Sequence, residues 1–210
     1  MQILSFDELN NLGRERRSIP YNKYFGEMDL TDLQKKSRVL FATDMEEKIM
    51  FVFALILAMI ENNSIDLEYA SNTLYEQYKQ VCISYGIYNS NIDTYIRNIS
   101  RDIVDSTFDN LSDPYFLSAD RAVFVAENEA NTNYNNVDFE NAVKSGKTMK
   151  TWIDIRDNRE RKSHLKVGRT TIPINQNFIV GDSEMRFPKD TFYGASSKEI
   201  VNCRCSVQYS

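Results

Sequence analysis

Residues 138–155 read DFENAVKSGKTMKTWIDI, and the local pattern of the chain changes in the middle of this stretch. Up to Gly146 the apolar residues recur every three or four positions, which is typical of one face of an α-helix. After Gly146 come short pieces that favour strands, the first of them KTWIDI, separated by polar turns. The stretch therefore predicts that a helical region ends near Gly146 and that a β-containing region follows it.

Four long helices are predicted on the N-terminal side of this point, because apolar residues recur at steps of three and four in each of them. Thr31 is the expected N-cap of the first helix, Gly86 stops the second, and Pro114 breaks the chain before the fourth. The predicted helices span about 31–62, 67–85, 92–108 and 118–146. A capping box formed by Ser5 and Glu8 predicts a further short helix near the N-terminus.

Four short strands are predicted on the C-terminal side, within KTWIDI (150–155), TTIPI (170–174), NFIV (177–180) and IVNCRCSVQY (200–209). Side chains alternate along a strand, so the last piece would place Val201, Cys203, Cys205 and Val207 together on one buried face. The predicted fold class is α+β, with mainly helical N-terminal two-thirds and a small β-containing C-terminal part.

Membrane insertion and export are not expected. The longest apolar run, IMFVFALILAMI at 49–60, is well short of the roughly 20 residues that a membrane-spanning helix needs, and we interpret it as a buried helix. The N-terminus lacks the basic start and apolar run of a secretory signal. Three cysteines in 210 residues do not form a disulfide framework, so a reducing compartment is expected.

The net charge of −5 is unevenly spread along the chain. Residues 147–169 contain eight basic and only three acidic residues. A basic segment of this kind can bind nucleic acid or an acidic protein surface. The alternative is a solvated turn whose charges pair with one another.

Four stretches of the C-terminal half share their order and spacing with a known family: RAVFVAENEANTNYN, GKTMKTWIDIRDNRERKSHLKVG, NFIVGDSEMRFPKD and EIVNCRCSVQY. Together they resemble the C-terminal region of tailed-phage minor head proteins, the Mu F-like or phage head morphogenesis family. The chain departs from the family pattern at Lys189, where the family often has Gly, and at Asn128, where it has Thr. The matched positions are Arg121, Ala122, Glu129, Trp152, Asp157, Arg159, Arg161, His164, Gly168, Phe178, Met185, Phe187, Pro188, Asp190, Asn202, Cys203, Arg204 and Cys205.

The resemblance implies a family-like domain over residues 118–210, preceded by a helical region over 1–117. It also implies a structural protein of a phage or prophage head, a minor head protein that acts in head assembly near the portal vertex and in DNA packaging or ejection. Its expected partners are the portal, capsid or scaffold protein, with double-stranded DNA as a further candidate. The expected location is the virion, and the host cytoplasm during assembly. Candidate residues for binding DNA or a partner are Lys147, Lys150, Lys162, Lys166 and Arg169.

The matched polar residues are interpreted mainly as a structural clasp, a network of polar ties and core anchors that holds the C-terminal part together. His164, Cys203 and Cys205 suit a zinc ion, but the sequence indicates no fourth ligand, so thiols packed in the core are the favoured interpretation and no cofactor is expected. The clasp is predicted to comprise Glu129, Trp152, Asp157, Arg159, Arg161, His164, Asn202, Cys203, Arg204 and Cys205.

An enzyme is not the favoured interpretation. The segment around His164 has no second carboxylate pair, no nucleophile with a base at a sensible spacing and no Gly-rich phosphate loop. The alternatives that stay open are a zinc-dependent hydrolase that uses His164, Cys203 and Cys205, a nucleotide-modifying toxin domain from the same family, and an interaction module without chemistry of its own.

Overall fold

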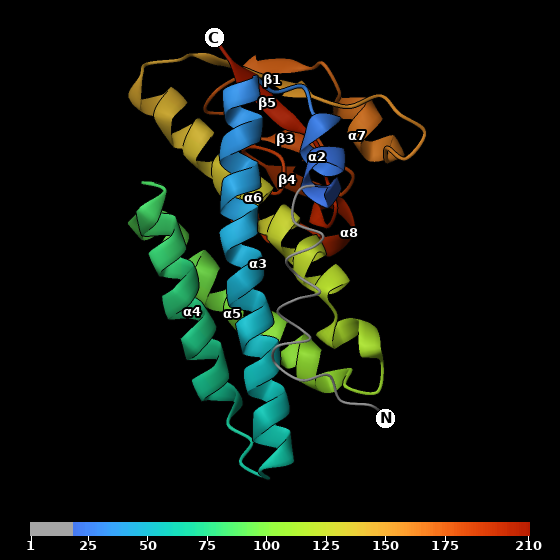
Figure 1. The fold of residues 1–210 in the computed structure, drawn as a ribbon. Helices are drawn as coiled ribbons and strands as arrows, with labels where there is room; N and C mark the ends of the chain where they lie inside the picture. The colour runs from blue at the N-terminus through green and yellow to red at the C-terminus, as the bar shows by residue number, and fades with distance from the viewer. Residues whose placement is uncertain (1–18) are drawn as a thin grey trace. The chain divides into compact units, whose positions relative to one another are not determined.

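Helices form most of the chain in the computed structural model, which describes residues 19–210 (Figure 1). The short helix predicted around Ser5 and Glu8 lies outside the described residues. The helices of the N-terminal region are α2 (Ile19–Gly26), α3 (Asp32–Glu61), α4 (Leu67–Ser84), α5 (Ser90–Asp109), the short 3₁₀ helix η1 (Pro114–Leu117) and α6 (Ala119–Lys144).

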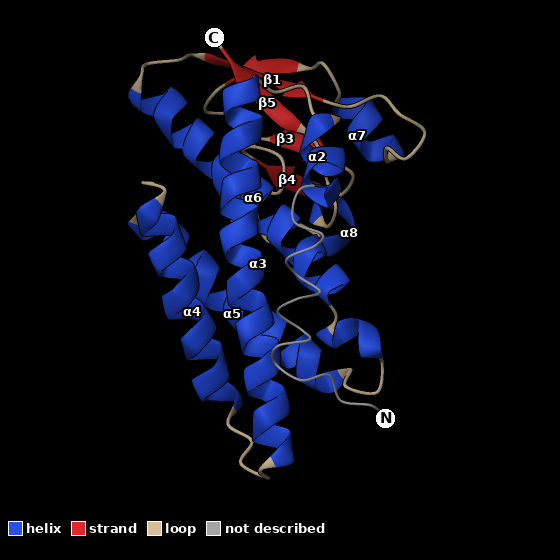
Figure 2. Ribbon diagram, in the orientation of Figure 1, coloured by secondary structure: helices blue, strands red, loops and turns tan. Residues whose placement is uncertain are grey.

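The C-terminal part contains two small antiparallel sheets (Figure 2). The predicted class, a helical N-terminal region with four long helices followed by a small β-containing part, is therefore confirmed. The elements after α6 are β1 (Met149–Ile153), α7 (Lys162–Val167), β2 (Thr171–Pro173), β3 (Phe178–Val180), β4 (Ser183–Met185), α8 (Ser197–Ile200) and β5 (Ser206–Tyr209).

The described chain divides into two compact units, each made of two stretches of sequence. The boundary predicted from the sequence was a single point between residues 117 and 118. We call the two units the helical unit and the mixed unit. The helical unit contains 19–21 and Leu40–Ala126, and the mixed unit contains Asn22–Val39 and Glu127–Ser210. The helices α3 and α6 contribute residues to both units.

The helical unit is built around apolar faces that the sequence periodicity predicts. Asp66 caps α4 by accepting a hydrogen bond from the Tyr69 backbone at 2.9 Å, and Gly86 follows the helix with a φ of +66°, a conformation that favours glycine. The apolar run of α3 is buried at Phe53 but leaves Phe51 42% exposed. One face of this run therefore packs in the core, while another face is exposed. No helix in 19–210 is both long and apolar enough to span a membrane.

Arg121, one of the motif residues, ties three elements of the helical unit together. Its guanidinium donates hydrogen bonds to the Thr107 and Ser106 hydroxyls on α5, at 2.6 and 2.7 Å, and to the Phe116 carbonyl of η1 at 2.9 Å. Five donors in a planar fork make arginine suited to such a junction. Its presence at the start of α6 is thus explained by packing within this unit.

The mixed unit is organised by β1, the central strand of the larger sheet, whose order is β2-β1-β5. Trp152 of β1 lies opposite Val207 of β5, and Lys150 lies opposite Ile172 of β2. The hairpin β3-β4 forms the second sheet, with Gly181 at a φ of +60° in its two-residue turn. The core between these elements consists of Trp152, Val167, Phe178, Val180, Met185, Cys203 and Cys205.

The predicted strand at 200–209 was wrong in its first half. Residues 197–200 form α8, and β5 begins only at Ser206, so Cys203 and Cys205 lie in the turn that leads into the strand. Asn202 adopts a φ of +54°, which no strand residue does, and the Cys205 backbone N–H donates to Cys203 Sγ at 3.4 Å. Both thiols are still buried together, because the turn folds over the core and not because strand side chains alternate.

Candidate functional site

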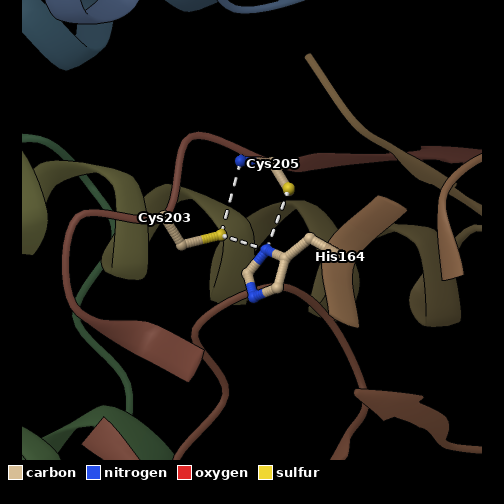
Figure 3. A group of neighbouring side chains, drawn as sticks. All are labelled: His164, Cys203 and Cys205. Carbon is tan, nitrogen blue, oxygen red and sulfur yellow. Dashed lines mark hydrogen bonds between the residues drawn. The ribbon is translucent and has the colours of Figure 1, made fainter. Parts of the chain in front are cut away.

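Three side chains from distant parts of the sequence meet in the interior of the mixed unit. His164 comes from α7, and Cys203 and Cys205 come from the turn before β5 (Figure 3). His164 Nδ1 lies 3.4 Å from Cys205 Sγ and 3.6 Å from Cys203 Sγ. Each of the three residues is only 2% exposed. The structure therefore brings together the three residues that the sequence singled out as candidate zinc ligands.

The short helix α7 is held in place by a close approach at its end. Gly168 follows the helix, and a Cβ at this position would lie 2.2 Å from Asp154 Oδ2, so only glycine fits without displacing that carboxylate. Asp154 is buried and accepts hydrogen bonds from Arg156 at 3.2 Å and Arg169 at 3.1 Å. The carboxylate thus fixes the chain on both sides of α7, which orients His164.

Aromatic packing fixes the imidazole ring. The Trp152 and His164 rings meet edge to face, with centroids 5.7 Å apart and an interplanar angle of 90°. On its other side Trp152 contacts Phe178 in a similar arrangement, at 5.2 Å and 77°. Such pairs add stability beyond the area that they bury.

The second imidazole nitrogen faces Glu199 of α8, a residue that no motif in the sequence indicates. His164 Nε2 lies 3.3 Å from Glu199 Oε2, which is within the distance of an ion pair. The two atoms do not form a hydrogen bond. Ser163 Oγ donates to the same carboxylate oxygen at 2.7 Å, and Glu199 is 5% exposed. A Cβ at Gly181 would lie 2.6 Å from Glu199 Oε1, so glycine in the hairpin makes room for this carboxylate.

The electrostatics of the cluster distinguish its two thiols. Burial opposes ionisation of Cys203, but hydrogen bonds from Cys205 and His164 and the positive charges of His164 and Lys189 hold its pKa well below the ordinary thiol value. The hydrogen bond to Cys203, together with burial, raises the pKa of Cys205 well above that value. Burial lowers the pKa of His164, yet its interactions with Cys203 outweigh this effect and raise it. Cys203 is therefore the more acidic thiol.

One further acidic side chain reaches the cluster. Cys205 Sγ lies 3.9 Å from Glu160 Oε1, while Glu160 Oε2 accepts a hydrogen bond from the Arg156 backbone at 2.7 Å. Glu160 is partly buried, and burial is the main cause that raises the pKa of its carboxyl group. Its spacing of four residues before His164 carried no recognisable signal in the sequence.

The two departures from the family pattern contact each other. Lys189 Nζ donates to Asn128 Oδ1, which also accepts a hydrogen bond from the Asn202 backbone at 2.7 Å. Lys189 adopts a φ of +70°, a conformation that favours glycine, which is the residue the family often has there. The side chain is 4% exposed, and burial lowers its pKa to about 8.

Several predicted clasp residues form one ion-pair network. Arg204 contacts Asp157 Oδ2 and Glu27 Oε2, both at 2.7 Å, and Arg159 contacts the same two carboxylates. Arg161 donates to the Val201 carbonyl near the cysteine turn. Glu27, beyond the end of α2, was not anticipated, because nothing in its local sequence indicates a contact 177 residues away.

Glu129 and Asn202 contribute differently. Glu129 is 5% exposed on α6, and its charge raises the pKa of Lys189, against the larger lowering by burial. Asn202 acts through its backbone N–H and its positive φ, not through a side-chain contact that the sequence could indicate.

The five predicted basic contact residues do not share one environment. Lys147, Lys162, Lys166 and Arg169 are exposed, and Arg169 also pairs with Asp154. Lys150 is fully buried and donates to the Arg186 carbonyl at 2.7 Å, and its ammonium group lies 5.1 Å from the centre of the Phe178 ring. Lys150 must therefore be removed from the candidate binding residues, because its position on β1 directs it into the core.

No protein-family model, curated protein or solved structure matches this chain.

A buried carboxyl group beside this region predicts a pH effect on stability. Burial raises the pKa of Glu127 to about 7, against a smaller opposing effect of Lys189. The native state then holds a proton that the unfolded state loses above about pH 4.5, so stability falls as the pH rises from about 4.5 to 7. Glu127→Gln is expected to raise the free energy of unfolding at pH 8 by on the order of 1–3 kcal/mol and to change little at pH 5.

Urea unfolding of both proteins at the two pH values measures this difference. The matched control is Glu184→Gln, which removes an exposed carboxylate of the same unit and should stay within about 0.5 kcal/mol of the wild type at both pH values. A Glu127→Gln variant that is no more stable than the wild type at pH 8 would contradict the assignment.

Proposed function

We propose that this chain is a structural protein of a tailed-phage or prophage head, a minor head protein that acts in head assembly near the portal vertex and in DNA packaging or ejection. The observation that supports this best is the convergence of the motif residues. Trp152, His164, Phe178, Cys203 and Cys205 lie far apart in the sequence, yet they share one small core. Proteins that share a fold tend to keep the residues that build it, together with the order and spacing of those residues.

The enclosure of the cluster favours a structural role over the enzymatic alternative. His164, Cys203 and Cys205 are each 2% exposed, which leaves a substrate no access to the thiols or to the imidazole. A cavity of about 570 Å³ does lie in the mixed unit, but its lining includes Asp29, Gln34, Asp138 and Tyr209 and none of the three cluster residues. This cavity is therefore separate from the candidate chemistry.

The expected partners are the portal, capsid or scaffold protein, and double-stranded DNA. Lys162 and Lys166 on α7, together with Lys147, are exposed cations suited to phosphate groups or to an acidic protein surface. The arginines of the same segment are engaged, since Arg156, Arg159 and Arg169 each pair with a carboxylate of the mixed unit. Any contact with DNA is therefore assigned to the lysines.

Disruption of the gene in the phage or prophage that carries it tests the proposal. We expect a loss of infectious particles and the appearance of empty or misassembled heads in electron micrographs, with recovery when the wild-type gene is supplied in trans. Purified wild-type particles should contain the chain, as measured by mass spectrometry. Normal titre and normal heads after disruption, or particles that lack the chain, would refute the proposal.

A further inference from the structure

We propose that His164, Cys203 and Cys205 bind one zinc ion, with Glu160 as the fourth ligand. The distances between the ligand atoms match those of a zinc site. At Zn–S and Zn–N bond lengths of about 2.3 and 2.05 Å, a tetrahedral site separates nitrogen from sulfur by about 3.5 Å. The two Nδ1–Sγ distances here are 3.4 and 3.6 Å, and the ligand atoms of all three residues lie within 4.8 Å of one another.

One nitrogen atom, His164 Nδ1, faces the sulfur atoms of both cysteines. A ring nitrogen carries at most one proton, so Nδ1 can donate to only one of the two thiols. A cation between the three atoms satisfies all of them at once, and imidazole and thiolates are the ligands that zinc prefers. Hard cations such as Mg²⁺ and Ca²⁺ are disfavoured by the two sulfur ligands.

Glu160 is the proposed fourth ligand, which the sequence did not indicate. Its Oε1 lies 3.9 Å from Cys205 Sγ, close to the separation of two ligand atoms on one zinc ion. It is not among the ligand atoms that lie within 4.8 Å of one another, so the carboxylate must move closer to His164 and Cys203 when the ion binds. Its other oxygen is anchored by the Arg156 backbone, which leaves Oε1 directed at the cluster. The ligands therefore come from the loop before α7, from α7 itself and from the turn before β5.

The surroundings match those of a metal-bound histidine. Such a histidine usually places its second ring nitrogen against a carboxylate, which orients the ring. Here Glu199 Oε2 lies 3.3 Å from His164 Nε2 and is itself held by the Ser163 hydroxyl. The Cys205 backbone N–H donates to Cys203 Sγ, a contact that stabilises a thiolate.

A buried cation lies beside the site. Two thiolates and the Glu160 carboxylate exceed the charge of one zinc ion by a single negative charge, and the Glu199 carboxylate beside His164 adds another. The buried Lys189 lies close enough to Cys203 to offset part of this charge. Zinc binding requires both thiols to lose their protons to solvent and His164 to be neutral. Because the site is closed and has four protein ligands, the ion would act as a cross-link between segments and not as a catalyst.

The test uses the full chain, purified under reducing conditions with an affinity tag free of histidine. Elemental analysis should find about one zinc per chain, and Cys203→Ser with Cys205→Ser should abolish it. Cys82→Ala is the matched control: it removes a thiol that is equally buried but lies in the helical unit, and it should keep the zinc. Removal of zinc by a chelator should lower the midpoint of thermal unfolding, and added zinc should restore it.

A second measurement covers variants that fail to fold. Wild-type chain stripped of metal is titrated with Co²⁺, and the absorption bands of a tetrahedral thiolate-bound ion should saturate at one equivalent. Glu160→Gln should keep the thiolate absorption but weaken zinc affinity by about tenfold or more in competition with a chromophoric chelator, whereas Glu184→Gln should not. Purified chain without zinc that also fails to take up Co²⁺ would overturn the site, and unchanged affinity in Glu160→Gln would overturn the fourth ligand.

Discussion

Replacing Arg38 by alanine is expected to destabilise the mixed unit by about 2–4 kcal/mol, because it removes the buried partner of an ion pair and leaves the buried amide oxygens of Asn131 and Asn135 without this donor. The Arg38 side chain is fully buried, and burial lowers its pKa, an effect that the Asp138 carboxylate partly offsets. The guanidinium contacts Asp138 at 3.1 Å, Asn135 at 3.3 Å and Asn131 at 3.4 Å. After the substitution, three polar groups of α6 would lack their donor.

Urea unfolding followed by tryptophan fluorescence measures this loss, since Trp152 is the single tryptophan and lies in the mixed unit. Lys198→Ala is the control: the Lys198 side chain lies in the same unit, is 61% exposed and pairs with Asp182 at 3.3 Å, so its removal should change stability by no more than about 0.5 kcal/mol. A loss below about 1 kcal/mol in Arg38→Ala would show that the network does not stabilise the fold. Arg38→Met keeps an apolar side chain at this position, so its stability separates the contribution of the packed arginine stem from that of the charge.

Trp152→Ala is expected to cost about 3–5 kcal/mol, the range typical of large buried aromatic residues. Trp152 is completely buried on the central strand, and its ring contacts both His164 and Phe178. Loss of the ring would leave a cavity between the sheet and α7, so the orientation of His164 would be lost together with the stability. Trp152→Phe keeps part of the volume and should lose less, about 1–2 kcal/mol.

Circular dichroism during urea unfolding follows these variants, because the fluorescent residue is itself replaced. Phe192→Ala serves as the comparison, since Phe192 is an aromatic residue of the same unit that is 69% exposed. We expect it to lose less than about 1 kcal/mol. Equal losses in Trp152→Ala and Phe192→Ala would mean that the core around β1 is not the main source of stability.

The helices were predictable because their signals are local. The first was expected over 31–62 and is found at Asp32–Glu61. Thr31 and Gln34 cap its start reciprocally, because the side chain of each accepts a hydrogen bond from the backbone N–H of the other. The third was expected from Ile92 to just before Asp109 and is found at Ser90–Asp109. Its last turns bury Val104 and Thr107, and the Thr107 hydroxyl donates to the Ile103 carbonyl at 2.6 Å.

The three central residues of the candidate site were predictable, but their surroundings were not. His164, Cys203 and Cys205 stand out in the sequence because histidine occurs once and cysteine three times. Glu160 and Glu199 do not stand out among many acidic residues, and only the tertiary fold brings them to the imidazole and the thiols. The strand expected at the cysteines failed for a similar reason, because a positive φ at Asn202 cannot be read from alternating residues.

The contact between Lys189 and Asn128 makes the two residues unequal in their dependence on each other. Without the lysine, Asn128 Oδ1 would still accept a hydrogen bond from the Asn202 backbone N–H. Without the asparagine, the Lys189 ammonium group would be buried without this acceptor, in a backbone conformation that favours glycine. A substitution of Asn128 is therefore expected to be tolerated only together with one of Lys189, whereas Lys189 can be replaced alone.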